Sequence, residues 1–79
     1  MTLFELRDQI TIQGETRIEE PTNDRGNRVL LHAEDIQYAD IPEEIGYRQV
    51  AYIWAVTSSI HNAYQPALVI ELEEKEEED

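Results

Sequence analysis

Residues 50–56 read Val-Ala-Tyr-Ile-Trp-Ala-Val, a continuous apolar and aromatic run in a chain of 79 residues. A run this short, rich in β-branched and aromatic side chains, favours a strand over a soluble amphipathic helix. It predicts a strand over Gln49–Thr57. Because the run is continuously apolar and aromatic, we expect this strand at the centre of a sheet, where a single helix can cover only one face and the other is left to solvent or a partner.

The segments that follow this run predict a loop and a last strand. Residues 58–66 contain Ser, His, Asn and Pro, which are typical of a connection. In Ala67–Glu73, the apolar residues Leu68, Ile70 and Leu72 alternate with residues that become acidic toward the end. Such alternation indicates a strand with one core face and one wet face.

The N-terminal residues predict one short helix. Thr2 and Glu5 have the spacing of a capping box, in which each side chain satisfies the backbone N–H of the other residue. The apolar residues that follow fall at helical spacing on one face: Leu3, Leu6 and Ile10. We expect a helix over about residues 3–9, followed by a turn at Gly14.

Between the helix and residue 50, the sequence predicts a hairpin and an irregular segment. Residues 15–20 alternate and precede a dense run of turn formers at 21–27, and a return strand is expected at Arg28–Ala33. Residues 35–46 predict a loop with one helical turn near Pro42. The whole order indicates an α+β fold, an antiparallel sheet of about four strands with the N-terminal helix packed on one face. We expect one compact domain at 1–73 and a disordered acidic tail at 74–79.

Charge is the strongest functional signal. Eighteen acidic and six basic residues give a formal net charge of -12. Residues 71–79 hold seven acids and one lysine, a net charge of -6, so residues 1–70 carry the other -6. A protein this acidic is attracted to basic surfaces and repels nucleic acid and anionic membranes. We expect the tail to be mobile and to contribute only a non-specific negative potential. Acids in residues 1–70 can instead be held in defined positions.

The residue types argue against an enzyme, a metal site or a cofactor. The chain has no cysteine, and its two histidines, His32 and His61, form no ligand pair. Ser58 and Ser59 near His61 lack any nucleophile motif, and the three glycines are isolated, so no phosphate loop exists. No apolar run approaches the length that spans a bilayer. We therefore expect a cytoplasmic, non-enzymatic protein that binds neither membrane nor nucleic acid directly.

The predicted central strand presents two different rows of side chains. Ala51, Ile53 and Ala55 would let a helix approach closely, which leaves Tyr52 and Trp54 on an uncovered face as binding anchors. In the simpler interpretation the large side chains form the core and the alanines face outward, because a small domain usually needs its largest groups inside. The sequence leaves both open.

The candidate binding residues combine these aromatics with acids in loops and at strand ends. They are Tyr52, Trp54, Tyr64, Asp24, Glu34, Asp35, Asp40, Glu43 and Glu44. The acids would stand in for phosphates and the aromatics would anchor the complex.

The chain resembles small acidic accessory proteins of phages and mobile elements of Gram-positive bacteria. The similar pieces are Leu3 and Leu6 leading into Ile12-Gln13-Gly14, then Tyr52-Ile53-Trp54-Ala55, then Leu68-Val69-Ile70-Glu71. This resemblance implies an anti-CRISPR, anti-restriction or DNA-mimic type of inhibitor in the cytoplasm of a host cell. The partner would be a basic surface of a nucleic-acid-binding host protein. The alternative is a homo-oligomeric structural or regulatory module, in which a sheet face or the edge near Ala67–Leu72 pairs with another copy.

Overall fold

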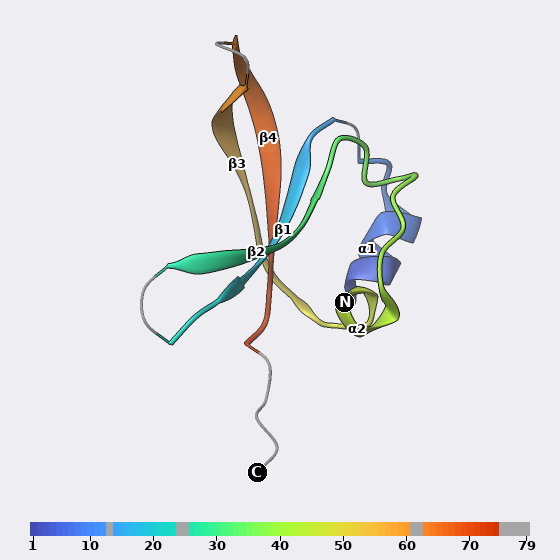
Figure 1. The fold of residues 1–79 in the computed structure, drawn as a ribbon. Helices are drawn as coiled ribbons and strands as arrows, with labels where there is room; N and C mark the ends of the chain where they lie inside the picture. The colour runs from blue at the N-terminus through green and yellow to red at the C-terminus, as the bar shows by residue number, and fades with distance from the viewer. Residues whose placement is uncertain (13, 24–25, 61–62, 75–79) are drawn as a thin grey trace.

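The computed structural model describes residues 1–12, 14–23, 26–60 and 63–74. Two short helices and four strands follow one another along the chain (Figure 1). Their bounds are α1 Leu3–Gln9, β1 Thr16–Pro21, β2 Asn27–Ala33, α2 Glu43–Gly46, β3 Val50–Ile60 and β4 Ala63–Leu72. The chain thus has an α+β fold.

The four strands form one mixed sheet in the order β2-β1-β4-β3. β1 pairs antiparallel with β2, and β3 pairs antiparallel with β4, as expected of two hairpins. The two hairpins meet through β1 and β4, which run parallel, with Thr16 opposite Leu68 and Ile18 opposite Ile70. The expected purely antiparallel sheet is therefore wrong, because alternation of side chains predicts strands but does not encode the direction in which distant strands pair.

Helix α1 begins with the predicted capping box. Thr2 Oγ1 accepts the Glu5 N–H at 3.1 Å, and Glu5 Oε1 accepts the Thr2 N–H at 3.0 Å. Leu3 and Leu6 are buried in the core, which confirms two of the three residues predicted for the apolar face. Ile10 is the exception: it caps the helix in an extended conformation and is exposed, because the helix ends one residue before it.

The position of β3 differs most from expectation. Val50–Ile60 is the edge strand beside β4, not the central strand predicted for residues 49–57. The central strands are β1 and β4, which also means that Ala67–Leu72 lies inside the sheet and offers no free edge to another copy. A wholly apolar run indicates burial on both faces, but the sequence holds no second signal of where in the sheet the run is placed.

The predicted loop at 58–66 is also wrong. Ser58–Ile60 and Ala63–Pro66 continue β3 and β4 as a paired ribbon, and His61 and Asn62 lie outside the described residues. β1 pairs with β4 only from Leu68 to Glu71. The distal part of the β3–β4 hairpin is therefore a two-stranded ribbon that projects beyond β1, as Figure 1 shows.

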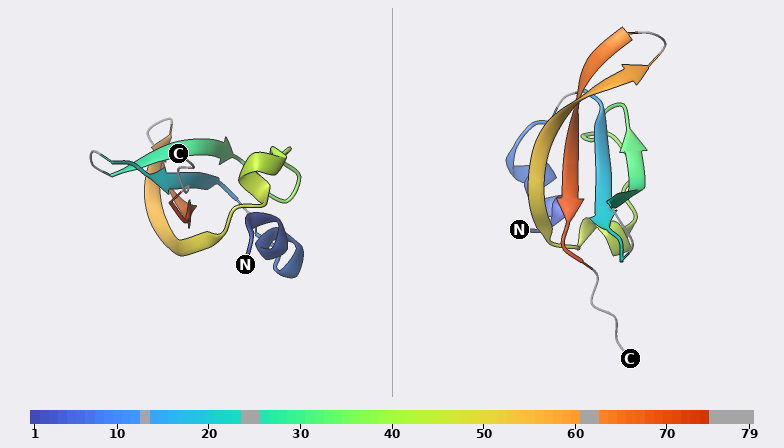
Figure 2. Two further views of the ribbon diagram at one scale, coloured as in Figure 1. Left: turned by 90° about the horizontal axis from the view of Figure 1, so that it is seen from below. Right: turned by 90° about the vertical axis from the view of Figure 1, so that its left-hand side faces the viewer.

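The core lies between the sheet and the helical side of the molecule. Strand side chains of β1 and β4 join side chains of α1 and of the segment after β2, and the cluster is Leu3, Leu6, Ile12, Ile18, Ala33, Ile36, Ile70 and Leu72. The right-hand view of Figure 2 shows the four strands in front and α1 behind them. One face of the sheet is thus left without a helix. No helix among the described residues is long and apolar enough to cross a membrane.

Candidate functional site

The exposed edge of the sheet at β3 is the first candidate surface. Ala51, Tyr52, Ile53, Trp54 and Ala55 are all exposed, although they form the most apolar stretch of the chain. Tyr52 is 65%, Ile53 45% and Trp54 37% exposed. Large apolar groups that alternate between two faces and remain exposed on both are unusual, and contiguous exposed apolar surface marks interaction sites.

Strand pairing assigns these side chains to the two faces of the sheet. Ile53 lies opposite Ile70, on the face of the core cluster, while Trp54 lies opposite Val69 on the other face. A register shift between Val50 and Tyr52 places Tyr52 opposite Glu71, on the same face as Trp54. Tyr52 and Trp54 therefore lie on the face without a helix, which is the arrangement that makes them available to a partner.

The outer edge of β3 is blocked only at its beginning. Thr2 forms an isolated antiparallel bridge with Gln49, and the Val50 N–H donates to the Met1 carbonyl at 2.8 Å. Beyond that point β4 is its only strand neighbour in the described sheet. The strand carries no charge and no proline from Val50 to Ile60, and these are the usual devices that protect an edge. The opposite edge strand, β2, has both Arg28 and His32 and a register shift against β1.

Residues 34–44 form a second candidate surface, which we call the acidic segment. The segment contains five carboxylates and no basic residue, and all five are exposed: Glu34, Asp35, Asp40, Glu43 and Glu44. Tyr38 stands among them and is 88% exposed. In the described residues, the Asp35 carboxylate accepts the Gln37 N–H at 3.1 Å, and none of the five carboxylates forms an ion pair.

The acidic segment is held in position by a buried anchor and by hydrogen bonds. Ile36 is fully buried in the core. Gln37 Oε1 accepts the Ile12 N–H at 3.0 Å, and Arg7 Nη1 donates to the Ala39 carbonyl at 3.2 Å. These contacts tie the backbone of residues 36–39 to α1 and to the chain that follows it.

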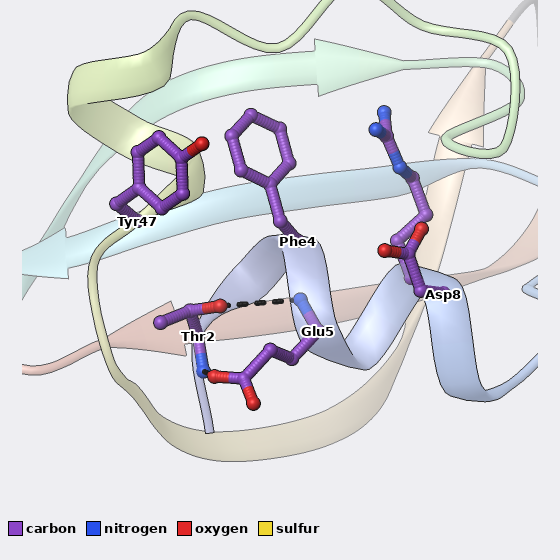
Figure 3. A pocket seen from close by; sticks show the side chains of 6 residues that line it. Thr2, Phe4, Glu5, Asp8 and Tyr47 are labelled. Atoms are coloured by element: carbon purple, nitrogen blue, oxygen red, sulfur yellow. Dashed lines mark hydrogen bonds between the residues drawn. The ribbon is translucent and has the colours of Figure 1, made fainter.

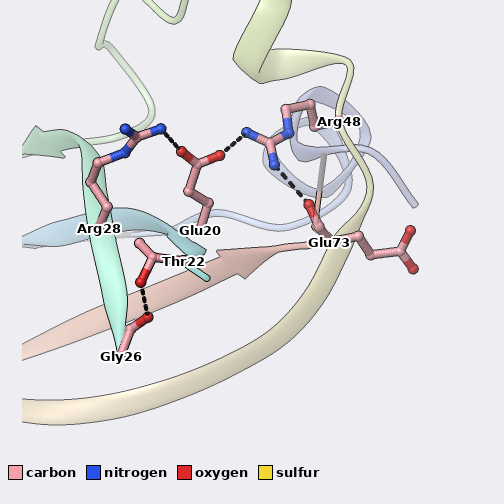
Figure 4. Close-up of polar contacts among 6 residues, drawn as sticks. All are labelled: Glu20, Thr22, Gly26, Arg28, Arg48 and Glu73. Atoms are coloured by element: carbon pink, nitrogen blue, oxygen red, sulfur yellow. Dashed lines mark hydrogen bonds and ion pairs between the residues drawn. The ribbon is translucent and has the colours of Figure 1, made fainter. Parts of the chain in front are cut away.

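The arginines that the structure describes are all engaged within the molecule. Arg7 bonds to the Ala39 carbonyl, and Arg17 forms an ion pair with Glu19 at 3.9 Å. Glu20 receives the other two from opposite sides, Arg28 and Arg48, as Figure 4 shows. Arg17, Arg28 and Arg48 thus pair with acids of β1, and Arg7 donates to a backbone carbonyl of the acidic segment, so none of the four forms an ion pair with a carboxylate of that segment.

Glu20 is the one acid of the described chain that is buried with strong partners. Arg48 Nη1 donates to Glu20 Oε1 at 2.8 Å, and Arg48 Nη2 donates to the Glu73 carbonyl at 2.7 Å. The hydrogen bond from Arg48, aided by Arg28, lowers the pKa of the Glu20 carboxyl despite its burial. This network joins β1, β2, the segment between α2 and β3, and the residue after β4.

An open pocket of about 460 Å³ lies on α1, lined by Thr2, Phe4, Glu5, Arg7, Asp8 and Tyr47 (Figure 3). The Phe4 and Tyr47 rings meet edge to face with centroids 5.0 Å apart, and the Arg7 guanidinium lies 5.2 Å from the Phe4 centroid. Glu5 is occupied by the capping box, whose hydrogen bonds lower the pKa of its carboxyl. The other acid of the lining, Asp8, is exposed.

The structure places one of the histidines considered for metal binding or catalysis, His32, beside an acid. His32 Nε2 lies 2.6 Å from Glu15 Oε1, on adjacent segments of the β1–β2 hairpin. No three potential metal ligands come together in the part of the chain that the structure describes. His61 lies outside that part.

The nine predicted binding residues fall on separate surfaces. Tyr52 and Trp54 lie on β3, facing away from the core, whereas the five acids of the acidic segment lie on the side that Ile36 anchors to the core. The structure therefore does not bring the aromatics and these acids together. Asp24 lies outside the described residues, as does the side chain of Tyr64 in β4.

Sequence reasoning missed two exposed side chains that belong to these surfaces, Ile53 on β3 and Tyr38 in the acidic segment. The charge pattern contained a signal for the second, since Tyr38 is flanked by acids on both sides in the sequence. The sequence contained no such signal for Ile53, because an isoleucine within an apolar run cannot be distinguished from a core residue. Comparison with protein families, with curated proteins and with solved structures found no match for this chain.

Proposed function

We propose that this chain is a non-enzymatic, acidic binding protein that occupies a basic surface of a nucleic-acid-binding protein and so blocks that surface. The observation that supports the proposal is the acidic segment, with five exposed carboxylates, none of them paired with a described arginine, near an exposed tyrosine. A protein that binds phosphates offers arginines and lysines, and fixed carboxylates are complementary to them.

Tyr38 gives the acidic segment a second means of recognition. An exposed aromatic ring stacks on a guanidinium group, and an adjacent carboxylate pairs with the same group. Tyr38 is nearly fully exposed, next to Gln37, whose side chain is fixed by the Ile12 N–H. The proposed partner surface is therefore rich in arginine, as nucleic-acid channels are.

Charge complementarity predicts how the complex responds to salt. Exposed charges are screened over about 8 Å at physiological ionic strength, so the association rate should fall steeply as salt rises. Because nucleic acid is held by the same cations, the chain and DNA should compete for the partner.

The proposal is tested with two variants of equal net charge. The first neutralises the acidic segment with Glu34→Gln, Asp40→Asn, Glu43→Gln and Glu44→Gln, and leaves Asp35, which accepts a backbone N–H, unchanged. The second deletes residues 74–79. Each variant has a net charge of -8, so a difference between them reports the position of the charge rather than its amount.

Immobilised protein is incubated with bacterial lysate and eluted with a salt gradient, and each retained protein is then tested for DNA binding in a gel shift, with and without the chain. We expect retained proteins whose DNA binding the chain abolishes, an effect that the deletion preserves and the neutralised variant loses. If the two variants compete with DNA equally well, or if the retained proteins bind no nucleic acid, the proposal is wrong.

A further inference from the structure

We propose that β3 pairs antiparallel with β3 of a second copy, so that two chains form one continuous eight-stranded sheet about a two-fold axis. The surface is the outer edge of β3 with the exposed side chains of residues 51–57 on its two faces. This inference is independent of the proposed function, because it uses a different part of the molecule.

The outer edge of β3 has the backbone groups needed to pair with another strand. Its inner neighbour is β4, and the hydrogen bond from the Val50 N–H to Met1 shows that the outer groups of this strand accept an antiparallel segment. Past Val50, successive outward N–H and C=O groups face no other strand of the described sheet. Unpaired edge groups on a long strand without charge or proline are a template for pairing with another chain.

The distribution of charge favours a second copy of the chain as the partner of this edge. Two chains that each carry -12 repel one another over most of their surfaces. β3 is eleven residues long and uncharged, so two copies can meet there without placing like charges opposite one another. A basic protein would instead be drawn to the acidic segment. The uncharged strip is therefore the place where this chain is complementary to itself.

Two-fold pairing would also stabilise the two-stranded ribbon of β3 and β4 that projects beyond β1. Val56–Ile60 pair only with Ala63–Ala67, beyond the end of β1, and two-stranded ribbons are marginal by themselves. Antiparallel overlap of residues 51–59 of two β3 strands leaves the Met1 contact of Val50 in place and puts the midpoint, Ala55, on the axis. The projecting half of each copy then lies beside the first half of its partner's strand and gains a third strand.

The same alignment provides side-chain contacts on both faces of the sheet. It places Trp54 opposite Val56 of the partner subunit on the face without a helix, and Ile53 opposite Thr57 of the partner subunit on the other face. Pairs of aromatic and β-branched side chains stabilise neighbouring strands. The strand is only about 37 Å long, at about 3.4 Å per residue. This contact is small beside the roughly 800 Å² per partner of stable complexes, so we expect dissociation in the micromolar range.

The first measurement is mass against concentration by sedimentation equilibrium. The chain of 9.2 kDa should double in mass between low and high micromolar concentration. Raising NaCl from about 0.05 to 0.5 M should tighten the dimer several-fold, because screening removes repulsion between two acidic chains. Binding to a basic partner has the opposite salt dependence. The variant with a neutralised acidic segment should still dimerise, so failure of either proposal leaves the other testable.

Matched lysine variants locate the interface. Ile53→Lys puts a charge on β3 and should weaken dimerisation at least tenfold. Val29→Lys makes the same kind of change at an exposed β-branched residue of the other edge strand, β2, and should leave dimerisation unchanged within about twofold. Trp54, the one tryptophan of the chain, supplies a second readout, since its emission should shift to shorter wavelength as the dimer forms.

A cysteine variant tests the proposed β3–β3 contact even if Ile53→Lys fails to fold. The chain has no cysteine, so Ala55→Cys and Val29→Cys each introduce a single thiol. Paired strands hold facing Cα atoms about 4.5–5.5 Å apart, within reach of a disulfide. Ala55→Cys should form covalent dimers on mild oxidation much faster than Val29→Cys. A chain that stays at 9.2 kDa at high concentration and salt, or equal cross-linking of the two variants, would overturn the proposal.

Discussion

Trp54 on β3 lies directly opposite Val69 on β4, and the two differ sharply in exposure, 37% against 1%. Val69 belongs to the face without a helix and is nevertheless buried. An opposite side chain on the same face lies within about 5.5 Å, so Trp54 is placed to cover Val69. Trp54 thus serves the folded monomer while keeping more than a third of its own surface exposed.

Replacing Trp54 by Ala should therefore destabilise the monomer moderately. Removing a buried tryptophan costs about 3–5 kcal/mol, and we expect about 1–2 kcal/mol here because Trp54 is partly exposed already. Urea denaturation at low micromolar concentration measures the change. Tyr52→Ala is the control, since Tyr52 is more exposed and lies opposite Glu71. An equal loss for Tyr52→Ala would show that Trp54 has no special role over Val69.

Gly46 in α2 should tolerate no side chain while Phe4 is present. A Cβ atom added at Gly46 would lie 2.1 Å from Phe4 Cζ. Gly46→Ala should lower the free energy of unfolding by about 1–3 kcal/mol through overpacking, although alanine favours helices. The smaller side chain of Phe4→Leu should relieve most of this cost in the double variant. Additive losses in the double-mutant cycle would contradict a direct clash.

Glu20 should make the stability of the protein depend on pH in the acid range. Its pKa is lower in the folded protein, chiefly because Arg48 donates to the carboxylate. The stabilisation is therefore present above the pKa of an unfolded glutamate, near 4.3, and is lost as pH falls through the lower, folded value.

Glu20→Gln should cost about 2 kcal/mol at pH 7, because two arginines lose their charged partner. The difference from the parent protein should shrink as pH falls through the lowered pKa of Glu20 in the folded protein, since both side chains are then neutral. Chemical denaturation at several pH values measures it, with the exposed Glu43→Gln as the control. A difference that is constant from pH 3 to 7 would argue that the carboxylate charge is unimportant.

Gln37 should control binding through the acidic segment without changing its charge. Its side chain accepts the Ile12 N–H at 3.0 Å and lies 3.5 Å from the Arg7 carbonyl as a donor. Gln37→Ala should cost about 1 kcal/mol of stability and weaken competition with DNA for the partner. Gln9→Ala, at an exposed position of α1, is the control. Unaltered competition by Gln37→Ala would mean that the carboxylates need no fixed position.

Local features were predictable because local sequence determines them. The capping box of Thr2 and Glu5, the extent of α1, the β1–β2 hairpin and the helical turn after Pro42 all follow from neighbouring residues. The strand at residues 50–57 was also recognised. The apolar pattern also predicted a central strand, whereas β3 lies at the edge of the sheet with exposed side chains.

Features that depend on distant residues were not predictable in the same way. The parallel pairing of β1 with β4 has no local signature. Pro66 suggested a loop, yet it lies in β4 just outside the stretch that pairs with β1, where a missing N–H is tolerated. The candidate acids were recognised from composition. That they lie on a different surface from Tyr52 and Trp54 could be seen only in the folded structure.

The parallel pairing of β1 and β4 has a consequence for how the chain is made. Ile18 and Ile70 are neighbours in the sheet although about fifty residues separate them, and contacts of this kind form late because a long loop must close first. A nascent chain that ends before Ala63 has only the β1–β2 ribbon as a possible sheet, with the apolar residues 50–56 already synthesised and unpaired. The four-stranded sheet is therefore completed only after β4 has been translated.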